Sequence, residues 1–383
     1  MHAICVVATG KDVGKTTVCI GLMKLLRDRG LRVNFIKPVG QSYVQINSAR
    51  MDKDSILMQS VYGLKGALTD MSPVTIPRGF VQDYIHKPDV EPLKKRILEA
   101  YERLSRDSDI LVVEGTGHAG VGSCFDLSNA EVAALLHAQA LVVAEGGIGS
   151  TIDEVCLNVS LFQAKGVDML GVVVNKVFPD KWKQLRDDLT KGLGNKGLTL
   201  LGVLPHDMVL TYPRMGQIAQ VLEAQVLCGQ EALDTRVENV IVAAMEPQNF
   251  LPRIRPHTLM ITPGDRIDNI LVALNTRHYS TDIRGTVDGI VLTGGLVPDL
   301  AILEIMKPSG VPVLMCKENT YPVAAKVRSM VFKILPDDLD KIELAQRLVK
   351  DHLDVETLLC KVLGDDRTQP GVRAVPSEGS AQG

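Results

Sequence analysis

The chain has 383 residues, of which 45% are hydrophobic and 23% charged, and 42 basic against 45 acidic side chains give a formal net charge of −3. This near-neutral balance argues against a nucleic-acid partner, because domains that bind nucleic acid through charge carry a strong basic excess. One Trp, seven Tyr and seven Phe also leave few rings for base stacking. At roughly 100–200 residues per domain, the length predicts two or three domains.

Cysteine usage and hydropathy bear on the compartment. The seven cysteines are widely spaced and form no CxxC pair, which argues against a zinc site or a redox dithiol. No apolar run reaches the roughly 18 residues that a membrane helix needs. The segment from His2 to Ala8 lacks the basic region and cleavage site of a signal peptide. We therefore expect a cytoplasmic protein with reduced thiols and no membrane partner.

Short apolar runs alternate with longer segments of helical period, which predicts an α/β fold built on a parallel sheet with helices on both faces. In the first half the predicted strands are Ala3–Ala8, Arg32–Lys37, Ile110–Glu114, Leu141–Ala144, Leu170–Asn175 and Leu200–Leu204. The predicted helices between them are Lys15–Arg29, Pro92–Leu104 and Ile152–Gln163.

A turn-prone stretch at residues 207–216 interrupts this pattern, and a second, shorter α/β series follows. Its predicted strands are Val240–Ala244, Leu259–Thr262, Gly289–Thr293 and Val311–Cys316, and its predicted helices are Arg266–Asn275, Leu300–Met306, Val323–Ser329 and Asp338–Val349. We expect a first domain over residues 1–210 and a smaller α/β domain over residues 211–363. The last segment, residues 364–383, is rich in Gly, Pro and Ser and is predicted to be disordered.

The sharpest local signal is the segment ATGKDVGKTT, residues 8–17, which lies between the first strand and the first helix. There, backbone N–H groups and the positive helix end can hold phosphate oxygens, while Lys15 reaches the β- and γ-phosphates and the Thr16 hydroxyl binds Mg²⁺. The strict pattern GxxxxGK[ST] needs Gly where this chain has Thr9, so a glycine-rich turn with a surface lysine is the alternative. The predicted nucleotide-binding residues of this phosphate loop are Gly10, Lys11, Asp12, Val13, Gly14, Lys15, Thr16 and Thr17.

Carboxylates that can complete a metal site follow two other strands. Glu114 ends a buried strand before a glycine-rich loop, as a Walker B acid does; the alternative is a strand-end acid that caps the next segment. In MDKDSILM, Asp52 or Asp54 can supply a further oxygen to the metal through water. On the residues alone, either of these two acids can instead be the N-cap of the helix that follows.

Two more strand ends carry candidate side chains. Lys37 closes the second strand and can stabilise anionic charge in a phosphoryl-transfer transition state, or it is an ordinary solvated lysine. Asn175 ends a later strand where its amide can read the edge of adenine, or it forms a turn. His118, in the loop after Glu114, can sense the γ-phosphate or be a turn histidine without a chemical role.

Several ordered motifs resemble a known family. ATGKDVGKTT, FIKPVG, MDKDSILM, VVEGTGHAGVG, DLSNAEVAALL, VAEGGIGSTIDE, VVVNKV and GVLPHD together resemble the dethiobiotin-synthetase-like P-loop domain, in the version found at the N-terminus of long phosphate acetyltransferases. The second half, with LMITPGDRIDNILVA and GIVLTGGLVPDLAILEIM, resembles the DRTGG domain that follows it in those enzymes. The resemblance covers roughly residues 2–350.

The resemblance implies a fold of the P-loop NTPase type and ATP with Mg²⁺ as cofactors. It implies that Thr16, Asp54 and Glu114 bind the metal, so that Asp54 is favoured over Asp52. It further implies a catalytic Lys15, a substrate-side catalytic lysine at Lys37 and adenine recognition near two residues, Asn175 and Pro205. A homodimer or a higher homo-oligomer is the expectation for such a family.

The chain also departs from the family. We expect the acetyltransferase catalytic domain to be absent, and the string Asp-Arg-Thr-Gly-Gly is replaced by Asp265-Arg266-Ile267-Asp268. Two hypotheses follow: an ATPase or ATP-dependent ligase acting on a small carboxylate or carbamate, and a nucleotide-responsive regulatory or scaffold protein acting on a metabolic enzyme partner. A degenerate P-loop scaffold that binds nothing is the third.

Two glycine-containing segments of the second half are open to a structural explanation. Leu292–Gly295 follows a predicted strand and can form either an anion-binding turn or a tight connection to the next helix. Asp265, after Pro263-Gly264, is expected to be the N-cap of the following helix.

Overall fold

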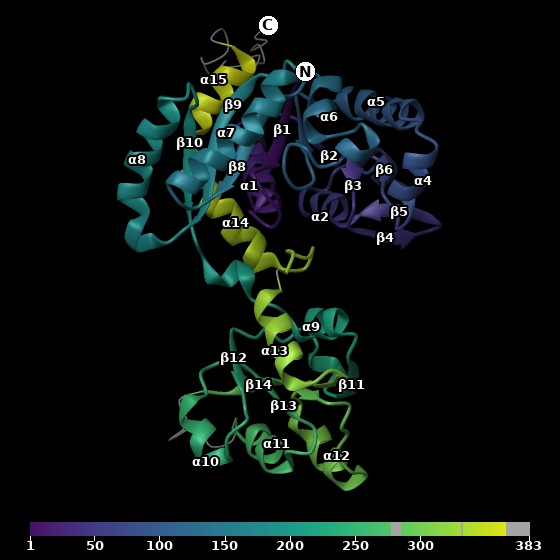
Figure 1. The fold of residues 1–383 in the computed structure, drawn as a ribbon, viewed down its shortest axis with the longest axis vertical. Coiled ribbons are helices and arrows are strands. Elements are labelled where there is room, and N and C mark those ends of the chain that lie inside the picture. The colour runs from purple at the N-terminus through teal and green to yellow at the C-terminus, as the bar shows by residue number, and fades with distance from the viewer. Residues whose placement is uncertain (277–284, 331, 365–383) are drawn as a thin grey trace, which may run out of the picture. The chain divides into compact units, whose positions relative to one another are not determined.

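The computed structural model describes residues 1–276, 285–330 and 332–364. The predicted disordered tail therefore lies outside the described residues, apart from Gly364. The chain divides into two units: Met1–His206 together with the segment from Ile334 onward, and Asp207–Lys333 (Figure 1). Among the described residues, no helix combines the length and apolar character needed to cross a membrane.

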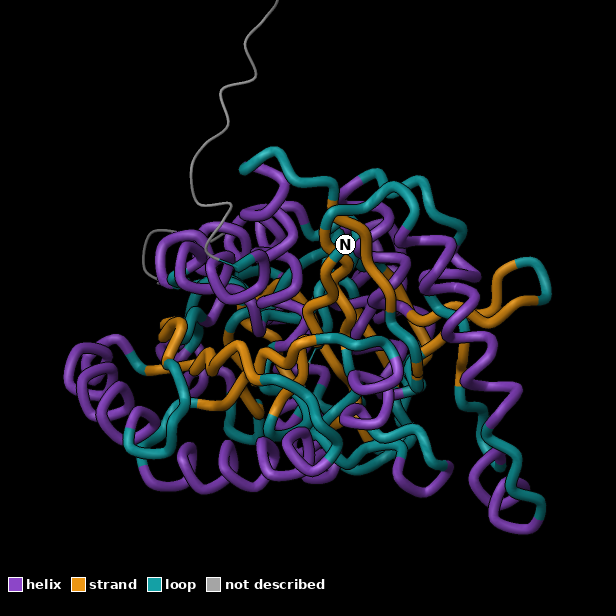
Figure 2. The backbone as a smooth tube through the Cα atoms, turned by 90° about the horizontal axis from the view of Figure 1, so that it is seen from above, coloured by secondary structure: helices purple, strands orange, loops and turns teal. Residues whose placement is uncertain are grey.

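A six-stranded parallel sheet organises the first unit, and its strand order is β10-β9-β8-β1-β7-β2. Nearly every side chain of the central strands is buried, as the two-sided apolar runs of the sequence predict. Figure 2 shows helices on both sides of the strands, and the predicted fold class is confirmed. The strands are β1 (His2–Ala8), β2 (Val33–Ile36), β7 (Ile110–Glu114), β8 (Gln139–Glu145), β9 (Met169–Val177) and β10 (Leu200–Pro205).

Right-handed crossovers determine which face each helix covers. The chain passes from β1 to β2 through a helix in one direction along the sheet, and all later connections run in the opposite direction. The first crossover helix therefore lies on one face of the sheet, and the later crossover helices share the other face. The first is α1 (Lys15–Asp28), and the later ones are α5 (Glu91–Ser105), α6 (Asn129–Leu135), α7 (Gly149–Ala164) and α8 (Trp182–Gly194).

Two C-terminal helices, α14 (Leu339–His352) and α15 (Val355–Leu363), cover the rest of the face that α1 occupies. Helix α14 packs on α1 and β10, and the backbone N–H of Asp354 donates to the Leu201 carbonyl at 2.7 Å. The predicted domain over residues 211–363 included these helices, whereas they belong to the first unit. The physical reason is that strands β8–β10 would otherwise expose one apolar face, because their own crossover helices lie on the other.

Most short elements between β2 and β7 were not predicted, although a helix after Asp52 and Asp54 was expected. An antiparallel hairpin of β4 (Tyr43–Ile46) and β5 (Ala49–Asp52) leads into helix α2 (Lys53–Tyr62). Its strands are largely solvent-accessible, so no apolar run marks them in the sequence. The remaining elements are β3 (Val39–Gly40), which pairs with β6 (Val74–Thr75), and the helices α3 (Leu68–Met71) and α4 (Phe80–His86).

The second unit contains a five-stranded sheet of order β11-β15-β14-β13-β12, in which only the β11–β15 pair is antiparallel among the described residues. One apolar cluster, which contains Phe250 and Ile290, and another, which contains Ile218 and Leu259, form its core. Its strands and helices are β11 (Gln225–Cys228), β12 (Asn239–Val242), β13 (Thr258–Pro263), β14 (Val287–Thr293), β15 (Val313–Met315), α9 (Met215–Leu222), α10 (Pro247–Phe250), α11 (Ile267–Leu274), α12 (Leu300–Met306) and α13 (Thr320–Ser329).

Internal hydrogen bonds explain the glycines after β14. The N–H of Gly294 donates to the Glu318 carbonyl at 2.8 Å and that of Gly295 to the Cys316 carbonyl at 2.9 Å. Both glycines have a positive φ, which a side chain disfavours. The N–H groups of both glycines are thus already bound within the protein, which argues against an anion-binding turn. The next helix, α12, begins only at Leu300, so the predicted tight connection to it is wrong. The expected N-cap role of Asp265 is wrong, because α11 begins one residue later and Arg266 occupies the cap position.

Candidate functional site

The phosphate loop joins the end of β1 to the start of α1. Thr9 has an ordinary backbone conformation and its N–H donates to the Val143 carbonyl at 2.9 Å, so the position does not require the glycine of the strict pattern. Gly14 is the N-cap of α1 with a φ of 105°, a conformation open to glycine. Asp12 has a φ of 58°, which is uncommon for a residue with a side chain and marks the loop as strained.

Lys15 is the first residue of α1 and is largely buried. Its Nζ lies 3.4 Å from the Gly10 carbonyl oxygen and donates to it, so the side chain folds back over the loop. Burial lowers the pKa of the Lys15 ammonium from its ordinary value, although the negative charge of Glu114 opposes the shift. The alternative of a surface lysine on a turn is therefore wrong.

Asn175, near the end of β9, holds the phosphate loop from two strands away in the sheet. Its amide Nδ2 donates to the Val13 carbonyl at 2.9 Å, and a Cβ built on Gly14 would lie 2.1 Å from the same nitrogen. The loop thus needs glycine at position 14 for a second reason, because the Asn175 amide fills the space a side chain would take. Sequence reasoning placed Asn175 at the site but not against the loop backbone.

Glu114, at the end of β7, lies at the centre of a buried charged cluster. The Thr16 hydroxyl donates to Glu114 Oε1 at 3.0 Å, and the Lys37 ammonium lies 3.0 Å from the same oxygen. Lys37 also forms an ion pair with Asp54 and lies 3.8 Å from Asp52 Oδ1. The carboxyl ends of the parallel strands β2 and β7 thus bring Lys37 and Glu114 together, as the rule that parallel strands share one carboxyl edge predicts. Residues from helices α1 and α2 and from the end of β5 complete the cluster.

The two acids of MDKDSILM have different roles. Asp52 is the N-cap of α2, because its Oδ1 accepts from the Asp54 N–H at 2.9 Å. Its own N–H donates to Ser72 Oγ at 2.9 Å, which ties the hairpin to the segment after α3. Asp54, two residues further along the chain, extends to the Lys37 ammonium. The choice left open on the residues is resolved: Asp52 caps the helix.

Lys37 is not a solvated lysine, because only 4% of it is exposed. Burial alone would lower the pKa of its ammonium, but the carboxylates of Glu114, Asp54 and Asp52 raise it well above its ordinary value. Lys37 is therefore a charged group that compensates buried carboxylates, and breaking such a cluster by removing one partner is strongly destabilising.

The donor set fits a hard divalent cation. Thr16 offers a hydroxyl, while Asp54 and Glu114 offer carboxylates, and Mg²⁺ prefers oxygen ligands of this kind. These groups are already linked through Glu114 Oε1 and Lys37. By contrast, no group of three or more His, Cys, Asp or Glu suited to a metal occurs in the part of the chain that the structure describes.

The loop after β7 is held by a residue that sequence reasoning missed. Asn129 accepts from the Thr116 N–H at 3.0 Å and donates to the carbonyls of Thr116 and His118. Asn129 is the first residue of α6 and directly follows the N-cap Ser128, which forms a capping box with Glu131. This capping box was the sequence signal that could have placed Asn129 at the start of a helix. The N–H of Gly120 donates to Nδ1 of His118, so this histidine makes a contact within its own loop.

An exposed aromatic residue lies beside the predicted base site. Phe178 follows β9, is 62% exposed, and its ring centroid lies 5.5 Å from that of His206. Pro205, the predicted adenine neighbour, directly precedes His206, whose N–H donates to the Val177 carbonyl at 2.8 Å. Sequence reasoning missed Phe178, although a large apolar residue three positions after Asn175 was a signal.

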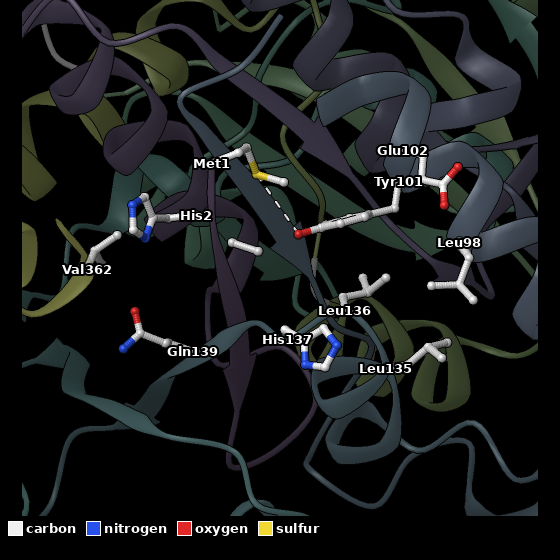
Figure 3. A pocket seen from close by; sticks show the side chains of 11 residues that line it. Met1, His2, Leu98, Tyr101, Glu102, Leu135, Leu136, His137, Gln139 and Val362 are labelled. Atoms are coloured by element: carbon white, nitrogen blue, oxygen red, sulfur yellow. Dashed lines mark hydrogen bonds between the residues drawn. The ribbon is translucent and has the colours of Figure 1, made fainter. Parts of the chain in front are cut away.

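A separate cavity of about 430 Å³ lies at the amino ends of β1 and β8, the edge of the sheet away from the phosphate loop. Met1, His2, Tyr101, His137 and Gln139 are among its lining residues (Figure 3). The Tyr101 hydroxyl points toward the Met1 sulfur, 4.0 Å away. None of the residues brought together at Glu114 lines it.

Comparison with known proteins agrees with the division of the chain into two units. The model of an AAA domain family (AAA_26) matches residues 2–214, and that of the DRTGG domain matches residues 217–330. Phosphate acetyltransferase of Nitratidesulfovibrio vulgaris is 31% identical over 364 residues, 92% of this chain and 50% of the relative. Phosphate acetyltransferase of Nitrosomonas europaea is 28% identical over 386 residues, 96% of this chain and 53% of the relative.

The chain thus spans about half the length of the curated relatives it matches. The predicted resemblance to a P-loop domain and a DRTGG domain, shared with phosphate acetyltransferases, is confirmed in that form. Among solved structures, septum site-determining protein MinD of Pyrococcus horikoshii, complexed with Mg-ADP, is 18% identical with a TM-score of 0.36. That match covers 55% of this chain and 83% of MinD.

Proposed function

Because the chain belongs to the AAA domain family, whose model covers residues 2–214, we propose that its first unit binds ATP with Mg²⁺ at the phosphate loop and transfers the γ-phosphoryl group. The acceptor is water or a small carboxylate or carbamate. The observation that carries the proposal is the buried cluster in which Thr16 and Lys37 contact Glu114, while Lys37 also contacts Asp54. A purely structural domain has no reason to assemble three buried carboxylates beside a phosphate loop, since buried charge is costly.

The phosphate loop supplies the anion site. Backbone N–H groups of Gly10–Thr17 and the positive end of α1 hold the phosphates, and Lys15 releases the Gly10 carbonyl to contact the β- and γ-phosphate oxygens. Thr16, Asp54 and Glu114 would hold Mg²⁺, which when bound neutralises charge on the phosphate oxygens. These assignments follow the dethiobiotin-synthetase-like pattern that the sequence resembles.

Phosphoryl transfer needs positive charge close to the phosphoryl group that is transferred. An oxygen of the acceptor attacks the γ-phosphorus with an electron pair and the bond to the ADP oxygen breaks, so negative charge develops on the leaving ADP oxygen while the transferred group carries its charge on its three equatorial oxygens. Lys37, at the end of β2, is the cation on the acceptor side, and Lys15 is the cation on the nucleotide side. Together they stabilise the transition state by fixed charges in a site that excludes water.

The base end of the site supports adenine. With Nδ2 committed to Val13, Asn175 keeps Oδ1, which accepts no hydrogen bond within the described residues. An acceptor suits the exocyclic amino group of adenine and not the carbonyl of guanine. Pro205 and the exposed ring of Phe178 then flank the base, which matches the preference of purines for apolar and aromatic faces.

Phosphate release from ATP and Mg²⁺, measured across a panel of small carboxylates and amines with bicarbonate, tests the enzyme proposal. Lys15→Ala and Glu114→Ala are expected to abolish turnover, whereas Lys24→Ala, which removes an exposed lysine from the same helix, leaves it unchanged. Equal turnover in all four proteins would refute the assignment of the site.

A regulatory function is the second candidate, and the DRTGG match over residues 217–330 favours it. In this alternative, ATP occupancy is sensed with little turnover, and the protein, as a homodimer or higher homo-oligomer, acts on a metabolic enzyme partner. Small-angle scattering and sedimentation with and without ATP distinguish it. A nucleotide-dependent change of oligomeric state without phosphate release supports regulation, and identical profiles count against it.

A further inference from the structure

Lys37 and the proposed metal ligands share the same oxygen atoms. The Lys37 ammonium lies 3.0 Å from Glu114 Oε1 and pairs with Asp54 Oδ2. Glu114 Oε1 is also the acceptor of the Thr16 hydroxyl at 3.0 Å. A cation bound by Thr16, Asp54 and Glu114 would therefore have to share these oxygens with an ammonium group.

Two cations a few ångströms apart in a buried site repel each other, because the low local dielectric screens their charges poorly. Lys37 is buried, so little solvent reaches its charge. Lys15 does not compete in the same way, since its Nζ is bonded to the Gly10 carbonyl. Of these two lysines, Lys37 is the one whose ammonium forms ion pairs with the carboxylates.

We propose that Lys37 is an internal cation that occupies the carboxylate cluster in the nucleotide-free protein, so that a divalent cation enters only together with a nucleotide. This inference rests on the proposed function. The phosphates of the incoming nucleotide give the Lys37 ammonium a new anionic partner as it leaves Asp54 and Glu114. The exchange couples metal binding to nucleotide binding and moves the lysine toward the transferred group.

The coupling has a clear functional result. Without nucleotide, free divalent cations do not bind to the carboxylates. Lys37 reaches the phosphates only when the nucleotide and its metal are both present. Asp52 stays with α2 throughout, because its Oδ1 is bound to the Asp54 N–H as a helix cap. The moving part is thus one side chain at the end of β2.

Binding of Mn²⁺ alone, followed by electron paramagnetic resonance and by thermal unfolding of the full chain, tests the exchange. The wild-type protein is expected to bind Mn²⁺ weakly, and Lys37→Met is expected to bind it at least about 10-fold more tightly. The unfolding temperature of Lys37→Met should fall without metal and recover with Mn²⁺, because Mn²⁺ replaces the lost ammonium. Equal Mn²⁺ affinity in the two proteins overturns the proposal.

Lys15→Met is the matched control, since it removes a second buried ammonium that contacts a carbonyl. It should raise the affinity for Mn²⁺ alone by clearly less than Lys37→Met does, by a factor at least about 3-fold smaller, because Lys15 acts on Glu114 through space and does not occupy its oxygen. An equal gain in both variants indicates general electrostatics and contradicts an exchange specific to Lys37.

A measurement on the wild-type protein covers the case in which Lys37→Met does not fold. Calorimetry with Mn²⁺ is expected to show at least about 10-fold tighter metal binding in the presence of adenylyl imidodiphosphate than in its absence. Tight nucleotide binding with no such coupling overturns the exchange and leaves the proposed function intact. No binding of adenylyl imidodiphosphate at all, with or without metal, refutes the proposed function itself.

Discussion

The amide nitrogen of Asn175 donates to the Val13 carbonyl oxygen at 2.9 Å, so the end of β9 fixes the backbone of the phosphate loop. This contact joins two segments 162 residues apart in the chain. It also fills the space above Gly14. The base end and the phosphate end of the proposed nucleotide site are therefore mechanically linked through one side chain.

Asn175→Ala should weaken binding of inorganic tripolyphosphate by roughly 3- to 10-fold, because one net hydrogen bond to the loop is lost. It should weaken binding of ATP further, because the acceptor proposed for the adenine amino group is lost as well. Calorimetry with both ligands checks this. If ATP binding weakens and tripolyphosphate binding does not, Asn175 acts on the base and the loop-holding role is wrong.

Phe178→Ala should weaken ATP binding by roughly 5- to 100-fold and leave tripolyphosphate binding unchanged, since stacking on the base is lost and the phosphate loop is untouched. Phe178→Tyr keeps an aromatic face and should bind ATP as the wild type does. Equal loss with both ligands would show that Phe178 supports the fold and not the base.

Helix α14 is predicted to stabilise the first unit through its contact with α1. A Cβ built on Gly21 would lie 2.2 Å from Val349 Cβ, whereas one built on Gly194, at the end of α8, meets nothing within 4 Å. Gly21→Ala should lower the free energy of unfolding by about 1–3 kcal/mol through overpacking. Gly194→Ala, the control, should raise it by about 0.5–1 kcal/mol.

Urea unfolding of the full chain gives both values. A Gly21→Ala variant as stable as Gly194→Ala would mean that α14 does not pack on α1 in solution.

The Arg32–Asp109 pair predicts a pH-dependent contribution to stability. Hydrogen bonds from the Arg32 side chain and backbone lower the pKa of the Asp109 carboxyl to about 2. Because the folded-state pKa is depressed, the stabilisation is fully present above the unfolded value of about 3.9 and is lost as the pH falls toward 2. The pair is partly exposed, so solvent screening limits its worth to about 0.5–1 kcal/mol.

Asp109→Asn should therefore be less stable than wild type from pH 5 to pH 8, and the difference should shrink between pH 4 and pH 3. Thermal unfolding at stepwise pH measures it. A difference that stays constant down to pH 3 would show that the charge of Asp109 does not contribute.

The strands of the first sheet could be predicted because each central one is apolar on both faces, and their carboxyl ends could be expected to share an edge. That rule is enough to place Glu114 and Lys37 at the same edge from the amino-acid sequence alone. It does not show that Lys37 is buried among carboxylates, because burial depends on the hairpin β4–β5, whose largely solvent-accessible strands carry no apolar run.

The partners of α14 and the orientation of Asn175 also escaped prediction. The amphipathic pattern of a helix predicts that one face is buried but does not show which element covers it. The predicted helix Asp338–Val349, which is α14 in the structure, was therefore assigned to the domain that precedes it in the sequence. The missing information was topological: β8–β10 have their crossover helices on one face only. For Asn175, similarly, the rule that parallel strands share one carboxyl edge places the residue near the site but does not predict which atom its amide contacts.

Calorimetric titration of the full chain with ATP in the presence of Mg²⁺ is the most direct test of the proposed phosphate loop. The wild type and Lys24→Ala are expected to bind with equal affinity, and Lys15→Ala should bind at least about 10-fold more weakly, because a charge-assisted contact to the phosphates is lost. Equal affinity in wild type and Lys15→Ala, or no heat of binding in the wild type, would contradict nucleotide binding at this loop.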